Sequence, residues 1–141
     1  MPKHSLDEVK ALVNEALKGD RTKVWFSGKS RSIDYVIHVY QCSEGEAEHI
    51  VLQGMLKLEP VDFAKTVIMN PAPDLVVADE YGLKEYEGHN WYVKLVIEDE
   101  EGNRLLTSIS FHPAERPLNL ATGEKLPMTL EASKHYKPKK K

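Results

Sequence analysis

Residues 91–97 and 105–112 carry polar side chains from which an acid–base site could be built. In both stretches apolar and polar residues alternate with a period of two, which indicates two paired strands with one buried face. The other face then holds a phenol, an imidazole, an ammonium and two hydroxyls. These groups belong to Tyr92, His112, Lys94, Ser108 and Ser110. An imidazole titrates near neutral pH and can act as acid or base, and an ammonium can stabilise negative charge.

The turn between the two strands decides which side chains face one another. A three-residue loop pairs Asp99 with Asn103 and places Gly102 at the left-handed position that suits glycine. His112 then stands diagonal to Tyr92, about 7–8 Å away. The predicted pairs on the core face are Trp91 with Phe111, Val93 with Ile109, Leu95 with Thr107 and Ile97 with Leu105, and those on the other face are Tyr92 with Ser110 and Lys94 with Ser108.

Three helices are expected before these strands. A serine followed three residues later by glutamate, the capping-box pattern, opens the first helix at Ser5 and the third at Ser43. The first should run to about Leu17, and the third should end before Pro60. Residues 32–41 repeat apolar side chains at the helical period, although their Val, Ile and Tyr content leaves a strand as the alternative.

Strands dominate the rest of the chain. We expect a short strand over residues 23–26, strands over 64–69 and 75–81, and a turn beginning at Gly82. Helices followed by a run of antiparallel strands predict an α+β fold, with the helices packed on a mainly antiparallel sheet. After Pro113, apolar residues alternate around residues 122–124 and predict one more hairpin. The expected organisation is a single domain over residues 1–132 and a basic flexible tail over 133–141.

Charge and composition limit the possible partners. Residues 113–141 contain seven Lys or Arg and three Glu, so they carry +4 and residues 1–112 carry −7. The negative part is poorly suited to gripping a phosphate backbone. The single Cys42 suits a reducing cytoplasm, and no apolar run approaches the roughly 18 residues of a membrane span. The His and Cys spacing predicts no metal site, and no cofactor motif is present.

Four segments resemble the motility quorum-sensing regulator (MqsR) family of toxins. They are residues 5–13, 58–66, 92–95 and 108–111, in that order along the chain. The family consists of small bacterial mRNA interferases with a RelE-like fold, usually encoded beside an antitoxin. The resemblance therefore implies a toxin-like core over residues 5–112, a cognate antitoxin protein as a partner, and an extension over residues 113–132 that lies beyond the usual end of such toxins.

The resemblance also implies a function for individual residues. The family cleaves single-stranded mRNA without metal, and its catalytic positions correspond to Lys65, Tyr92 and His112. The predicted hairpin register places Lys94, Ser108 and Ser110 beside Tyr92 and His112, as candidate RNA-binding residues. Such cleavage needs a base for the 2′-hydroxyl, an acid for the 5′-oxygen and cations at the phosphate. Two positions depart from the family pattern, because Ala78 replaces a glutamine and Gly82 replaces an arginine.

Three functions remain open on the sequence alone. The first is a metal-independent endoribonuclease, weakened by the changes at Ala78 and Gly82. The second is a non-catalytic binding or regulatory protein on the same scaffold, which the −7 charge of residues 1–112 favours. The third is an interaction module whose C-terminal hairpin docks a partner protein. Tyrosine and lysine alternating on a strand are also typical of a solvent-facing surface without any site.

Overall fold

The described chain combines three helices with a five-stranded sheet. The computed structural model describes residues 1–27 and 32–128, so the predicted tail over 133–141 lies outside the described residues. In chain order the elements are α1 (Leu6–Leu17), β1 (Val24–Phe26), α3 (Asp34–Tyr40), α4 (Glu44–Leu56), the 3₁₀ turn η1 (Pro60–Asp62), β2 (Phe63–Asn70), β3 (Val76–Tyr86), β4 (His89–Glu100), β5 (Asn103–Pro113), β6 (Leu118–Asn119) and β7 (Lys125–Leu126). The predicted α+β class and the C-terminal hairpin are confirmed.

Helices α1 and α4 begin where the serine signals predict. The Oγ of Ser5 accepts a hydrogen bond from the backbone N–H of Glu8 at 3.3 Å. At α4, Ser43 and Glu46 exchange two bonds of 3.1 Å, which is a complete capping box. The segment 34–40 is helical, so the strand alternative is wrong there. No helix in the described part of the chain is long and apolar enough to cross a membrane.

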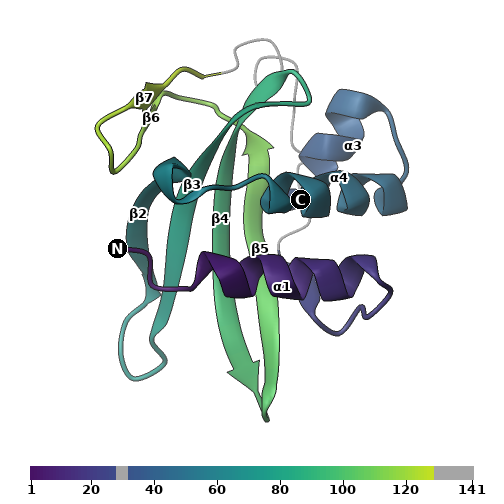
Figure 1. The fold of residues 1–141 in the computed structure, drawn as a ribbon, viewed down its shortest axis with the longest axis vertical. Helices are drawn as coiled ribbons and strands as arrows, with labels where there is room; N and C mark the ends of the chain where they lie inside the picture. Colours follow the sequence, from purple (N-terminus) through teal and green to yellow (C-terminus); the bar gives the residue numbers. More distant parts are fainter. Residues whose placement is uncertain (28–31, 129–141) are drawn as a thin grey trace, which may run out of the picture.

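The sheet has the strand order β1-β5-β4-β3-β2. Neighbouring strands run antiparallel, except that the short edge strand β1 runs parallel to β5. Figure 1 shows α1 and α4 lying across one face of this sheet, with the β6–β7 hairpin at the upper left, beside β2 and β3. The helices and one sheet face enclose the core, whose largest fully buried side chains include Trp91, Tyr81 and Phe111.

The predicted register of β4 and β5 is wrong, because their turn has two residues and not three. Glu101 and Gly102 both have positive φ, 53° and 85°, as a type I′ hairpin requires, and the strands follow them directly. A β-bulge at Ile109 then shifts the pairing once more. The result is that Tyr92 lies directly opposite His112.

The bulge also changes which residues of β5 face the helices. Between the turn and the bulge, Leu106 and Ser108 share the core face with Ile97 and Leu95. Leu106 is fully buried in the core cluster. The expectation that Leu105, Thr107 and Ile109 face the core is therefore wrong. The extra residue of the bulge reverses which side chains face the core between the turn and Ile109.

The turn expected at Gly82 is absent, because β3 continues through this residue to Tyr86. Gly82 pairs with Tyr92 and lies beneath the C-terminal hairpin. A Cβ atom built there would stand 2.9 Å from Leu126, 3.0 Å from Leu120 and 3.3 Å from Leu118. The glycine makes room for packing and does not form a turn.

Gly54 allows α4 to approach the sheet closely, which gives a first prediction. A Cβ there would lie 2.6 Å from Phe111 and 2.8 Å from Tyr86, two packed rings. Gly54→Ala should therefore lower the free energy of unfolding by about 1–3 kcal/mol, despite alanine's better helix propensity. Gly45→Ala, on the same helix with nothing within 4 Å, should be neutral or slightly stabilising. Urea denaturation measures both, and equal effects would contradict the close packing.

Tyr81, which is fully buried, and Tyr86, which is half-buried, give a second prediction. Burial raises the pKa of Tyr81 and of Tyr86 to about 12. The hydroxyl of Tyr86 donates to the Ile50 carbonyl at 2.6 Å, whereas that of Tyr81 has no partner among the described residues. Tyr81→Phe should thus be neutral or stabilising by up to about 1 kcal/mol, and Tyr86→Phe should cost about 0.5–1.5 kcal/mol. Urea denaturation would reject this if Tyr81→Phe proved the more damaging.

Candidate functional site

The candidate site lies on the sheet face opposite α1 and α4, which we call the outer face. Strand pairing places Lys65 of β2, Glu80 of β3, Lys94 of β4 and Ser110 of β5 in one row across this face. The next row holds Gly82, Tyr92 and His112. Residues that are opposite one another in neighbouring strands point to the same face, so both rows share a surface.

A pocket of about 500 Å³ opens at the β4–β5 end of these rows, within the usual range of ligand sites. Four sheet residues form one wall, and three residues that follow β5 form the other. The sheet residues are Tyr92, Lys94, Ser110 and His112, and the later ones are Glu115, Arg116 and Leu118. The pocket therefore combines an imidazole, a phenol, hydroxyl and carboxyl groups and two cations.

His112 is held between two aromatic rings. Its side chain is 3% exposed, and its ring centroid lies 4.9 Å from that of Tyr35 and 5.2 Å from that of Tyr92. Its Nδ1 lies 2.9 Å from the carbonyl oxygen of Pro113. Because a carbonyl can only accept, Nδ1 carries the hydrogen, and the neutral ring has its basic lone pair on Nε2. The backbone of the strand end thus fixes the tautomer.

Glu115 connects the histidine to helix α3. One carboxylate oxygen accepts a hydrogen bond from the Tyr35 hydroxyl at 3.0 Å, and the other lies 3.6 Å from His112 Nδ1. The Glu115 side chain remains 42% exposed, so this contact is screened by solvent. Glu115 therefore links the strand end at His112 to Tyr35 of α3.

Glu80 accepts a hydrogen bond from the Tyr92 hydroxyl and adds a negative charge between two lysines. The hydroxyl of Tyr92 donates to Glu80 at 2.7 Å, and pairing places Glu80 between Lys65 and Lys94. Within residues 1–27 and 32–128, the side chains of Lys94 and Arg116 have no hydrogen-bond or ion-pair partner. Two cations without an ion-pair partner in one pocket are suited to a ligand that brings its own negative charge.

The structure gathers most of the predicted site residues but not all of them. Tyr92, Lys94, Ser110 and His112 line the pocket, whereas Lys65 lies on the same sheet face outside it. The expectation that Ser108 stands beside Lys94 is wrong. The bulge turns Ser108 to the helix-covered face opposite Leu95, where it is fully buried.

Sequence reasoning missed four residues around the pocket: Tyr35, Glu80, Glu115 and Arg116. Only Glu115 had a usable signal, since it follows His112 by three residues around a proline that redirects the chain. The others reach the site through tertiary packing or strand pairing, which a local pattern does not reveal.

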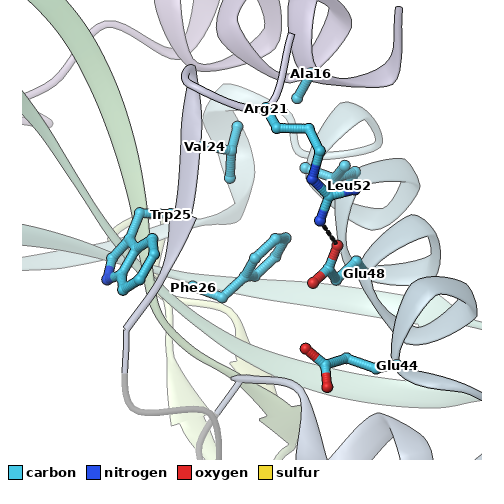
Figure 2. A pocket seen from close by; sticks show the side chains of 8 residues that line it. All are labelled: Ala16, Arg21, Val24, Trp25, Phe26, Glu44, Glu48 and Leu52. Carbon is cyan, nitrogen blue, oxygen red and sulfur yellow. Dashed lines mark hydrogen bonds and ion pairs between the residues drawn. The ribbon is translucent and has the colours of Figure 1, made fainter. Parts of the chain in front are cut away.

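A second pocket, of about 280 Å³, lies on the helix side between α1, β1 and α4 (Figure 2). Arg21 and Glu48 form an ion pair of 2.7 Å at its rim, and the Phe26 ring is directed toward Glu48. Its other lining residues are largely apolar, and Trp25 is 61% exposed. Without an imidazole or an unpaired cation in its lining, it is the weaker candidate for chemistry.

Comparisons with family models, with curated proteins and with solved structures found no match to this chain. The resemblance to the MqsR-type toxins therefore stays a prediction. Among the described residues, no cluster of three His, Cys, Asp or Glu side chains is placed to hold a metal ion. The pocket of about 500 Å³ beside Tyr92 and His112, the outer-face pocket, is the feature of this chain that bears on function.

Proposed function

We propose that the chain is a metal-independent endoribonuclease that acts on single-stranded RNA in the outer-face pocket. The observation that carries this proposal is the meeting of His112, Tyr92, Lys94 and Arg116 around one space of about 500 Å³. RNA cleavage without metal requires an acid–base group beside cations that can stabilise a phosphorane-like charge. Both kinds of group line this pocket.

The proposed reaction uses the RNA's own 2′-hydroxyl as the nucleophile. Nε2 of neutral His112 takes the proton from this hydroxyl as the 2′-oxygen attacks phosphorus. The bond from phosphorus to the 5′-oxygen breaks, and the leaving oxygen takes a proton from water in the open pocket. The products are a 2′,3′-cyclic phosphate and a 5′-hydroxyl. Lys94 stabilises the charge that develops on the phosphoryl oxygens.

Single-stranded RNA is the substrate that best fits this surface. A phenol such as that of Tyr92 offers a face on which an unpaired base can stack, whereas stacked bases in a duplex are not accessible. Because residues 1–112 carry −7, attraction must come from the few local cations and not from the whole molecule. Binding should accordingly be weak and sensitive to salt.

Cleavage of a structureless, 5′-labelled RNA in the presence of a chelator tests the proposal. His112→Asn should lower the rate about 10²–10⁴-fold, because it removes the proton acceptor. Lys94→Met should lower the rate while keeping the fold, and Lys65→Ala, outside the pocket, should have a smaller effect. His49→Asn changes an exposed histidine on α4 and should leave the rate unchanged.

Three results of this assay would contradict the proposal. The first is an absence of cleavage by the wild-type chain. The second is cleavage by His112→Asn at the wild-type rate, provided that far-UV circular dichroism shows both proteins folded. The third is a product that ends in a 3′-hydroxyl, because attack by the 2′-oxygen leaves the phosphate on this end, as the cyclic phosphate or as its hydrolysis product.

A non-catalytic binding or regulatory protein is the second candidate. The observation in its favour is that Glu80 already occupies the centre of the polar row and that His112 is almost fully buried. Under this alternative, single-stranded RNA or an antitoxin-like partner protein would bind without being changed. Binding of RNA with no cleavage under any condition would favour it over the nuclease.

The position of Glu80 gives a further prediction. Glu80→Gln keeps an acceptor for the Tyr92 hydroxyl but removes the negative charge between Lys65 and Lys94. Affinity for single-stranded RNA should rise about two- to fivefold, in keeping with the small energies of exposed charge pairs. Glu98→Gln, an exposed carboxylate near the turn of the same sheet face, should change affinity less. Fluorescence anisotropy measures both, and an unchanged or lower affinity for Glu80→Gln would contradict an anionic ligand.

A further inference from the structure

The segment after β5 is a built part of the fold. Ala121 donates its backbone N–H to the Phe63 carbonyl at 2.8 Å, and the Asn90 side chain donates to the Pro127 carbonyl at 2.9 Å. Lys84 and Glu124 add an ion pair of 2.5 Å. Leu118, Leu120 and Leu126 pack over Gly82, and the last two are at most 4% exposed. The segment is thus tied to β2, β3 and β4.

These anchors hold Arg116 at the pocket from both sides. Two residues before it, Ala114 is fully buried and donates to the Asn90 carbonyl at 2.8 Å. Two residues after it, the side chain of Leu118 packs on the sheet over Gly82. Pro117 follows directly, and a residue before proline is restricted to extended conformations. The backbone of Arg116 therefore has little freedom, while its exposed side chain lines the pocket.

The chemistry around Arg116 favours an anionic ligand. Glu115, the adjacent carboxylate, is engaged by Tyr35 and faces His112, and in the described parts of the chain it forms no ion pair with Arg116. Lys94 lines the same pocket from the sheet. A guanidinium can bind two oxygens of one phosphate at once, which a lysine ammonium does not do.

We propose that residues 113–128 complete the site and that Arg116 binds an RNA phosphate together with Lys94. This inference rests on the proposed function, because it takes single-stranded RNA as the ligand of the pocket. It adds that the extension supplies one of the two phosphate-binding cations, so that the sheet alone is an incomplete site. Arg116 is a binding residue here, and His112 remains the group that moves the proton.

A binding assay with an RNA that cannot be cleaved tests this role. The probe is a fluorescent, fully 2′-O-methylated single-stranded oligonucleotide, and anisotropy is followed over a range of salt concentrations. Arg116→Ala should weaken binding about five- to tenfold and reduce the slope of log affinity against log salt by about 0.7. Arg116→Lys should keep the wild-type slope and bind more tightly than Arg116→Ala but less tightly than wild type. It keeps the positive charge but loses the planar guanidinium that binds two phosphate oxygens.

The matched control is Lys125→Ala, which removes an exposed cation from the same extension outside the pocket. It should change affinity less than twofold. If the wild-type chain binds the probe and the two alanine variants behave alike, the role of Arg116 is overturned and the proposed function stands. If the wild-type chain does not bind the probe, both are overturned together. Thermal unfolding of each variant confirms that the fold is retained.

Discussion

The pairing of β4 with β5 is the constraint on which the rest of the structure depends. Its two-residue turn and its bulge at Ile109 together place Tyr92 opposite His112 on one face and Leu106 in the core on the other. A shift of one residue would exchange the two faces, burying the imidazole's neighbours and exposing the core. The same pairing that completes the core therefore also positions the candidate site.

Local signals in the sequence predicted the helices well, because the groups that start them are close in the chain. Ser43 and Glu46 satisfy each other's backbone donors whatever the rest of the fold does. The register of β4 and β5 was not predictable in this way. Two- and three-residue loops both accept Gly102, and the bulge becomes necessary only when Leu106 and Phe111 must both reach the helices. The same distinction applies to the candidate site. Its residues on β4 and β5 were predictable from the alternating pattern, whereas Tyr35 and Arg116 lie outside these strands and come to the site through tertiary packing.

Two adjacent carboxylates show how one strand serves both stability and the site. Asp79 faces the core side, where it is fully buried and accepts bonds from the backbone of Lys3 and His4 and from the Thr66 hydroxyl at 2.7–2.9 Å. These bonds tie the N-terminal segment and β2 to β3, and they compensate the desolvation of the charge. Glu80 points the other way and holds the Tyr92 hydroxyl. The alternation of the strand separates a structural carboxylate from one that tunes the pocket.

Gly82, in the middle of β3, is best explained by the burial of leucine side chains on the outer sheet face. Glycine within a strand costs roughly 0.5–1 kcal/mol relative to alanine, because it loses more conformational freedom on folding. Burial of a leucine side chain contributes about 1.5–3 kcal/mol, and both Leu120 and Leu126 are nearly fully buried over this position. The gain exceeds the cost, so the sequence favours docking of the hairpin over a better strand residue at Gly82. Docking covers the sheet at Gly82 and leaves the neighbouring pocket open beside Tyr92, with Glu115 and Arg116 at its edge. Packing of the hairpin on Gly82 thus determines which part of the sheet the extension covers, and it places Glu115 and Arg116 at the pocket.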